Sequence, residues 1–229
     1  MQDGTAMESA AGPAPSGKRT LRGTRLRVVA GFAVAAAVAV AALELWYPLH
    51  QRFVPKQFGV VEPGRIYRSG QISPSIIRET LARYDIRTVV SLQDYDANDD
   101  KHRAEREATD ALGIRELHFP LRGDGSGELR SYASALAEMA RADRDGAAVL
   151  VHCAAGTERT GAAVAFYRLL VQGRPASDVY QELRRGGWEP GDNPQLLVYM
   201  NEHMDELARQ LAEAGVIDRI PDPLPVIGP

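Results

Sequence analysis

The sequence contains a single cysteine in 229 residues, and this scarcity excludes two kinds of architecture. One thiol can form neither a disulfide within the chain nor a zinc site built from cysteines. Histidine is also scarce, with five residues, and none has a zinc-like spacing to other ligands. The 27 basic and 30 acidic residues nearly cancel, so no general basic character favours nucleic acid. We therefore expect no metal, no other cofactor and no nucleic-acid partner.

The composition is that of an ordinary globular protein, with 45% hydrophobic and 25% charged residues and no internal repeat. We expect one folded domain over residues 48–219. The proline-rich tail, residues 220–229, is expected to be extended and uncovered.

The N-terminal part of the chain has a different composition. Residues 1–27 are rich in small residues and end in a basic cluster, so we expect a disordered basic segment. Residues 28–47 are about 20 mainly apolar residues and predict a transmembrane helix. The basic cluster before it predicts a single-pass protein whose main domain is periplasmic or otherwise extracytoplasmic. A cleaved signal peptide and a buried core helix are the alternatives.

Strand-like and helix-like segments alternate along the rest of the chain. This pattern predicts an α/β fold with a central, largely parallel sheet flanked by helices. The expected strands cover residues 88–92, 114–119 and 147–151. The expected helices cover residues 73–84, 99–112, 128–142, 160–172, 176–185 and 194–214, the second ended by Gly113.

The only cysteine, Cys153, follows an apolar run that predicts a buried strand and precedes a glycine-containing loop and an apolar helix. Such a loop can hold an anion, because its backbone N–H groups and the helix N-terminus converge. The same field lowers a cysteine pKa, to roughly 3.5–7.5 in such positions. The Arg159 fork can bind two phosphate oxygens. The expected phosphate ligands are Arg159 and the backbone of Ala154, Ala155, Gly156, Thr157 and Glu158.

These residue types suit phosphoryl transfer to sulfur. Cys153 can attack phosphorus in line and form a phospho-cysteine intermediate, while Arg159 and the loop offset the developing charge. The Thr160 hydroxyl could donate a hydrogen bond to the sulfur when it leaves. We expect His152 to orient the loop through a hydrogen bond to backbone rather than to act as a base.

His152-Cys153, five further residues, and Arg159-Thr160-Gly161 resemble the signature loop of the cysteine-dependent protein tyrosine phosphatases, especially atypical dual-specificity members. The segments 64–71 and 86–92 are similar to the initial segment and first core strand of such members. The resemblance covers roughly 150 residues, from near Phe58 to near Leu211. It implies a phosphotyrosine phosphatase-like fold, a catalytic domain within residues 48–219, and a phosphorylated protein or small phosphomonoester as substrate.

The resemblance also implies a general acid on a loop about 30 residues before the cysteine. Asp124 lies 29 residues before Cys153, in the glycine-rich segment 122–127. Asp124 could instead serve only the geometry of a turn. Glu128, Asp94 and Asp96 are the other candidates for the acid.

The loop sequence allows other interpretations. An inert buried thiol does not explain the flanking glycine, arginine and threonine. A rhodanese-like sulfurtransferase would have a shorter loop. The interpretation as a catalytically weak or inactive module that docks phosphorylated partners stays open.

The absence of lysine from 154–158 favours phosphotyrosine or another monoester over phosphoinositides as the substrate. Trp188 is expected to pack between helices, with stacking on a substrate as the alternative.

Overall fold

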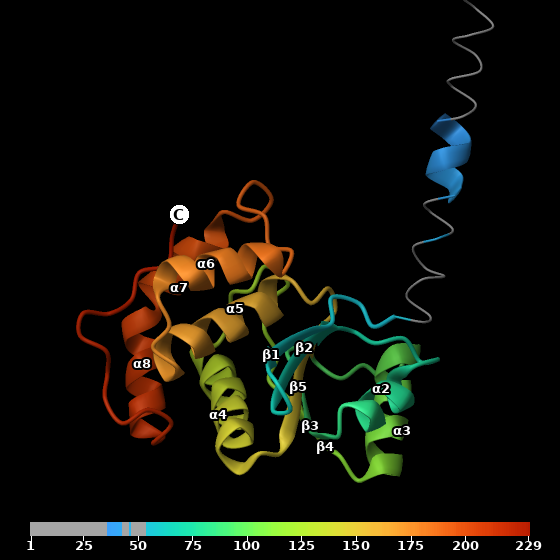
Figure 1. The fold of residues 1–229 in the computed structure, drawn as a ribbon, viewed down its shortest axis with the longest axis horizontal. Helices are drawn as coiled ribbons and strands as arrows, with labels where there is room; N and C mark the ends of the chain where they lie inside the picture. The colour runs from blue at the N-terminus through green and yellow to red at the C-terminus, as the bar shows by residue number, and fades with distance from the viewer. Residues whose placement is uncertain (1–35, 43–45, 47–53) are drawn as a thin grey trace, which may run out of the picture. The chain divides into compact units, whose positions relative to one another are not determined.

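The computed structural model describes residues 36–42, 46 and 54–229 (Figure 1). The chain divides into two units, residues 1–47 and 48–229. In the first unit, residues 36–42 are helical. No helix within the described ranges is long and apolar enough to span a bilayer. The predictions for residues 1–27, and for most of residues 28–47, fall outside the described part of the chain.

The second unit contains a five-stranded sheet with the order β1-β2-β5-β3-β4. Its strands are β1 (Gly59–Glu62), β2 (Ile66–Gly70), β3 (Ile86–Ser91), β4 (Arg115–His118) and β5 (Ala148–Cys153). The strands β2, β5, β3 and β4 pair in parallel with their neighbours, as predicted. The edge strand β1 pairs with β2 in the antiparallel direction. The sheet is therefore mixed.

Strand β1 was not predicted, although the turn that follows it has a sequence signal. The Arg65 N–H donates to the Glu62 carbonyl (3.0 Å), and Gly64 has φ = 75°. Pro63 and Gly64 thus occupy the two central positions of a tight turn, where proline and a glycine with positive φ are preferred. This turn folds β1 back on β2.

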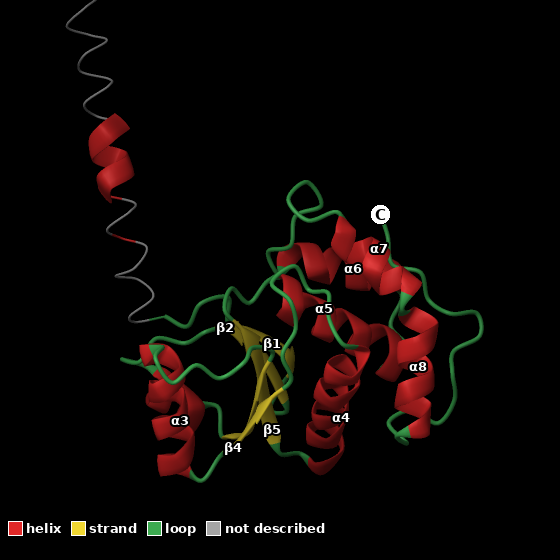
Figure 2. Ribbon diagram, turned by 180° about the vertical axis from the view of Figure 1, so that it is seen from behind, coloured by secondary structure: helices red, strands yellow, loops and turns green. Residues whose placement is uncertain are grey.

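Helices cover both faces of the sheet (Figures 1 and 2). The helices α2 and α3 lie on one face, and α4, α5 and the later helices lie on the other. Their bounds are α2 Ile77–Arg83, α3 Asp100–Leu112, α4 Leu129–Asp145, α5 Glu158–Phe166, the π-helix η1 Tyr167–Val171, α6 Ala176–Arg185, α7 Gln195–Glu202 and α8 Met204–Glu213.

The central strand β5 supplies both cores, which explains its unbroken apolar sequence. Val149 and Val151 belong to the larger cluster, with α4 and α5, whereas Ala148 and Leu150 belong to the smaller one, with α2 and α3. Successive side chains of a strand point to opposite faces, so a strand covered on both sides is apolar throughout.

The ends of α3 confirm the sequence prediction. The Asp99 carboxylate accepts hydrogen bonds from the amides of Lys101 (2.7 Å) and His102 (3.2 Å). Gly113 ends the helix with φ = 65°, a left-handed conformation that favours glycine.

Two other helix predictions were wrong in their bounds, and a third segment is helical as predicted but changes its type. The helix expected from Ser73 begins at Ile77, and the carbonyl of Ser73 accepts the Ile77 amide (3.0 Å). The helix expected over 160–172 continues beyond Phe166 as the π-helix η1. The helix expected over 194–214 is interrupted at His203, whose φ of −106° and ψ of 6° are not helical.

The sequence predicts an uncovered C-terminal tail, and this prediction was wrong. Ile227 is only 1% exposed and belongs to the larger core cluster. The Asn201 side chain of α7 holds the tail, because it accepts from the Ile227 amide (2.9 Å) and donates to the Ile227 carbonyl (2.9 Å).

Candidate active site

Cys153 is the last residue of β5, the middle strand of the sheet. In parallel sheets, ligands bind beyond the carboxyl ends of the strands. The side chain is 1% exposed, and the loop of residues 154–157 turns from it into α5. Strand, loop and helix thus form the local arrangement that the sequence predicts.

The loop directs a backbone donor at the sulfur. The Gly156 N–H donates to Cys153 Sγ (3.1 Å). Gly156 has φ = 84°, and a Cβ there would lie 2.5 Å from the Gly70 nitrogen. Only glycine fits this position, because both the backbone conformation and the close approach of β2 exclude a side chain.

Several groups together favour the thiolate form of Cys153. Burial raises the pKa of the thiol, but the Thr160 hydroxyl, the Gly156 and Thr160 amides and the Arg159 guanidinium outweigh it. The resulting pKa is below its ordinary value. A thiolate is the nucleophilic form of cysteine.

Arg159 is anchored at the end of the neighbouring strand β3. Its Nη1 donates to the Leu92 carbonyl (3.3 Å). Its Nε is buried and has no hydrogen-bond partner among the described residues. The Nε donor is therefore unpaired among the described residues, and the positive charge of the guanidinium lowers the pKa of Cys153.

His152 lies beside a buried carboxylate. Its Nε2 lies 3.0 Å from Glu105 Oε1 of α3, and both side chains are almost fully buried. Burial lowers the pKa of His152, but the Glu105 carboxylate more than offsets this and raises it. The Glu105 carboxylate thus holds the imidazole, and a hydrogen bond with the Cys153 backbone also raises its pKa.

Asp124 lies in a tight turn. Its Oδ1 accepts from the Ser126 amide (2.9 Å) and from the Ser126 hydroxyl (2.7 Å). These two bonds, together with the charge of Arg122, lower the pKa of the Asp124 carboxyl. Asp124 therefore shapes a turn, which was the alternative to its role as general acid.

The same turn packs against the start of α5. A Cβ on Gly125 would lie 3.4 Å from the Glu158 carbonyl carbon and 2.7 Å from a Leu196 methyl group. The Asn193 side chain donates to the Asp124 carbonyl (2.7 Å). The structure therefore brings the Asp124 turn next to Glu158, the first residue of α5.

The other acid candidates differ in position. Glu128 is the exposed residue preceding α4, and Asp96 accepts the Asn98 amide in an exposed turn (2.8 Å). Asp94 is exposed and stands two residues after Leu92, whose carbonyl binds Arg159. Of these three, Asp94 is the nearest in sequence to Leu92, the residue that binds Arg159.

Trp188 packs in the interior, as the sequence predicts. In this conformation its buried ring cannot stack on a substrate. Its side chain is fully buried and its Nε1 donates to the Asn193 carbonyl (3.0 Å). Its ring meets Tyr180 edge to face, with centroids 6.1 Å apart. The tryptophan thereby fixes the loop between α6 and α7.

Sequence reasoning missed two buried charges beside the loop. Glu105 gave no signal, because it belongs to a helix rich in charged residues. Arg68 gave none either, because only the structure shows that all five residues of β2 are buried and that this arginine needs a specific partner. Within the described residues, no three His, Cys, Asp or Glu side chains gather as metal ligands.

Comparisons with known proteins agree with this geometry. Residues 55–213 match the family model described as "Swiss Army Knife protein, DSP-PTPase phosphatase domain". The dual specificity protein phosphatase TpbA of Pseudomonas aeruginosa (strain UCBPP-PA14) is 30% identical over 143 residues, in a match that covers 58% of this chain. The match spans 60% of the length of that relative.

Solved structures show the same fold. The crystal structure of P. aeruginosa TpbA has a TM-score of 0.55 and 27% identity, and covers 69% of this chain and 91% of its own. The core catalytic domain of the PP-IP phosphatase SIW14 from S. cerevisiae has a TM-score of 0.54 at 19% identity, covering 71% and 95%. At that identity the likeness concerns the fold alone.

Proposed function

Because the chain belongs to the family of DSP-PTPase phosphatase domains, we propose that it hydrolyses phosphate monoesters through a phospho-cysteine at Cys153. One observation carries the proposal. The Cys153 sulfur is held at the end of the central strand with the Gly156 amide 3.1 Å away, and its pKa is lowered. A buried thiolate that accepts hydrogen bonds from backbone amides is suited to attack phosphorus.

In the first step, the Cys153 sulfur forms a bond to phosphorus as the ester oxygen departs. The amides of residues 154–158 and the Arg159 guanidinium bind the equatorial oxygens, where charge develops. Asp124 gives its proton to the leaving oxygen. Its pKa is low without substrate, and a phosphate dianion nearby would raise it, because like charges disfavour ionisation.

In the second step, water attacks phosphorus and the sulfur leaves as a thiolate. Asp124, now ionised, accepts the proton of that water. The Thr160 hydroxyl, which already lowers the pKa of the thiol, stabilises the departing sulfur. Phosphate is released and the enzyme returns to its starting state.

We propose phosphotyrosine or another phosphate monoester as the substrate. Glu158 places a negative charge in the first turn of α5, and its carboxylate accepts a hydrogen bond from the Thr157 hydroxyl. This charge disfavours highly anionic substrates. A second TpbA structure, 25% identical with a TM-score of 0.53, is a complex with pTyr.

The direct test is hydrolysis of para-nitrophenyl phosphate between pH 5 and 8. Wild type is expected to turn over, and Cys153→Ser to fall to background. Arg159→Lys is expected to lose about 100-fold or more in kcat/KM, because the fork that binds two oxygens is gone. Arg130→Lys, an exposed arginine on α4, is the matched control and keeps activity.

The competing function is a phosphate-binding module without turnover. It predicts phosphopeptide binding that needs Arg159, with no hydrolysis by wild type at any pH in this range. That result would reject the enzymatic proposal and keep the binding one.

We also propose that residues 28–47 anchor the protein in a membrane, with the catalytic domain on the extracytoplasmic side. The support is their length and apolar composition and the basic cluster before them. Cell fractionation combined with N-terminal sequencing tests it. A product in the soluble fraction that starts near residue 40 would instead establish a cleaved signal peptide.

A further inference from the structure

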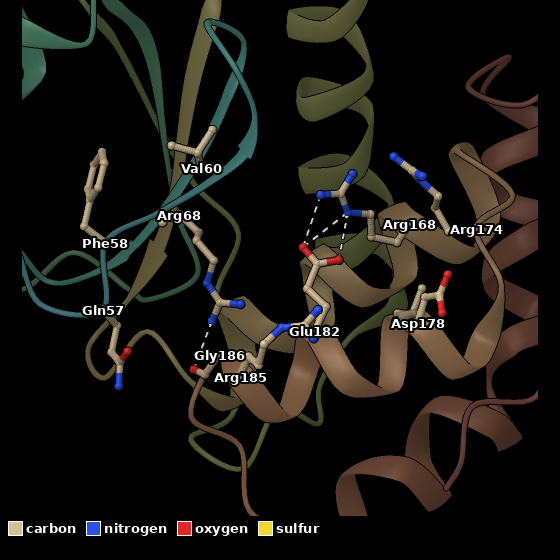
Figure 3. A pocket seen from close by; sticks show the side chains of 12 residues that line it. Gln57, Phe58, Val60, Arg68, Arg168, Arg174, Asp178, Glu182, Arg185 and Gly186 are labelled. Atoms are coloured by element: carbon tan, nitrogen blue, oxygen red, sulfur yellow. Dashed lines mark hydrogen bonds and ion pairs between the residues drawn. The ribbon is translucent and has the colours of Figure 1, made fainter.

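Arg68 is a charged residue in the interior of the sheet. It belongs to β2, is 7% exposed, and lies beside β5 with Val151 as its register partner. Its guanidinium lines a cavity of about 480 Å³ between β1, β2 and α6 (Figure 3). Burial lowers the pKa of Arg68, while the charges of Glu182 and Cys153 oppose that change.

The guanidinium of Arg68 binds backbone carbonyls. Its Nη2 donates to the Gly156 carbonyl of the phosphate-binding loop and to the Gly186 carbonyl after α6 (3.3 Å). Glu182, whose charge acts on Arg68, pairs instead with Arg168 (3.0 Å), as Figure 3 shows. Arg68 thus links the loop that carries the proposed chemistry to the loop between α6 and α7.

The contact is built closely on both sides. A Cβ on Gly186 would lie 2.5 Å from Arg68 Nη1, so only glycine leaves room for the guanidinium. Gly156 is also closely packed, because a Cβ there would meet Gln57 Cβ at 2.9 Å, and its carbonyl accepts from Arg68. Two glycines therefore border one buried cation.

The end of β2 and the residue after it bind two carbonyls of the loop. The Ala154 carbonyl accepts the Gln71 amide (3.2 Å), and the Gly156 carbonyl accepts from Arg68. In a trans peptide, the carbonyl and the following N–H point in opposite directions. Fixing the Gly156 carbonyl on Arg68 therefore directs the Thr157 N–H toward the opposite side, where the phosphate would bind.

We propose that Arg68 is a positioning residue, which holds the Gly156–Thr157 peptide so that the Thr157 amide faces the phosphate. It acts through the peptide and does not touch substrate. The inference rests on the proposed function of the loop. It assigns to β2, a strand far from the signature loop in sequence, a part in setting the phosphate-binding geometry.

Arg68→Met removes the donors and keeps an apolar stem. We expect kcat/KM for para-nitrophenyl phosphate to fall about 100-fold, the scale of losing one oriented amide. Binding of tungstate, a phosphate analogue, measured by calorimetry, is expected to weaken at least about 10-fold. Iodoacetamide alkylation of Cys153 is expected to require higher pH, because the Gly156 amide also loses its fixed orientation.

Arg168→Met is the matched control. Arg168 lines the same cavity and is 8% exposed, but it binds Glu62, Glu182 and the Val61 carbonyl rather than the loop. We expect it to lower the melting temperature while tungstate affinity stays within about two-fold of wild type. The two arginines thereby separate a general loss of packing from a loss of loop geometry.

Two further variants keep the test decisive if Arg68→Met does not fold. Arg68→Lys retains the charge and one donor group and is expected to recover part of the tungstate affinity. Gly186→Ala displaces the guanidinium without altering it, and is expected to weaken tungstate binding in the same direction.

Folded Arg68 variants that bind tungstate like wild type, with an unchanged alkylation profile, would overturn the inference. Neither readout needs turnover. If wild type binds tungstate and hydrolyses nothing, the proposed function fails while the role of Arg68 is still measured.

Discussion

The Asp124 carboxylate and the Cys153 sulfur are both stabilised in their ionised forms by donors from their own loops. Ser126 supplies two hydrogen bonds to Asp124, and Gly156 supplies one to the sulfur. Ionised sulfur suits a nucleophile, whereas a general acid must carry its proton. The hydrogen bonds of Ser126 therefore set the upper pH limit of the proposed mechanism.

Replacing Ser126 by alanine should move that limit. Ser126→Ala removes the hydroxyl donor, so the pKa of Asp124 rises toward its ordinary value. The protonated acid then persists to higher pH, and the basic limb of the kcat/KM profile shifts upward. Ser177→Ala, at an exposed position of α6, should leave the profile unchanged. If neither Ser126→Ala nor Asp124→Asn alters the basic limb, the acid is another residue, with Asp94 the first to examine.

The glycine at 156 should tolerate no side chain. Gly156→Ala combines a positive φ of 84° with a Cβ only 2.5 Å from the Gly70 nitrogen. A left-handed conformation alone costs alanine about 1–2 kcal/mol. We expect a lower melting temperature and a loss of about 100-fold in kcat/KM, because the amide leaves the sulfur. Gly191→Ala has open space around its Cβ and should match wild type in both measurements.

At the scale of elements, the edge strand β4 is fastened to α3 through one carboxylate. Glu116 accepts from Arg106 Nε (2.8 Å) and Thr109 Oγ1 (2.8 Å) of α3, and lies 2.7 Å from His118 Nε2. Burial opposes ionisation, but these three partners lower the pKa of Glu116 to about 2. The folded state therefore binds a proton at this position much less readily than the unfolded chain.

This shift makes stability depend on acid pH. Because the pKa is lower in the folded state, Glu116 stabilises the fold fully above about pH 4.5, and the contribution is lost as pH falls toward 2. The shift corresponds to roughly 3 kcal/mol. In urea unfolding, Glu116→Gln should be less stable than wild type at pH 7, and the difference should shrink below pH 4.5. Glu107→Gln, exposed on α3, should show no such convergence. A constant difference at all pH values would contradict the assignment.

At the scale of the whole second unit, residues 48–229, the C-terminal tail completes the larger core. Ile227 is 1% exposed, while its neighbour Val226 is 71% exposed. Asn201 binds both backbone groups of Ile227 and brings the tail back to α7. The matched family model ends at residue 213, so this chain adds a packed segment beyond it.

The tail should therefore contribute to stability and not to chemistry. Ile227→Ala is expected to lower the free energy of unfolding by about 2–5 kcal/mol, the usual cost of truncating a buried isoleucine. Val226→Ala should change it little. Both variants should keep wild-type kcat/KM under conditions in which they are folded. Equal stability of the two variants would show that the tail does not pack in solution.

Adjacent residues by themselves determined the strand–loop–helix around Cys153, the ends of α3 at Asp99 and Gly113, and the alternation that gives a sheet covered on both faces. These features depend on spacing along the chain, and local hydrogen bonds and side-chain periodicity encode them directly. The family resemblance followed from the same local pattern.

Only the tertiary structure decided that His152 pairs with Glu105, that Arg68 reaches the carbonyl of Gly156, and that the tail returns to α7. Each contact joins segments that are far apart in sequence and that meet only because β2 and β3 flank β5 or because the helices fold back over it. A buried charge must find a partner once folding removes its water, but the sequence does not say which partner the fold will bring within reach.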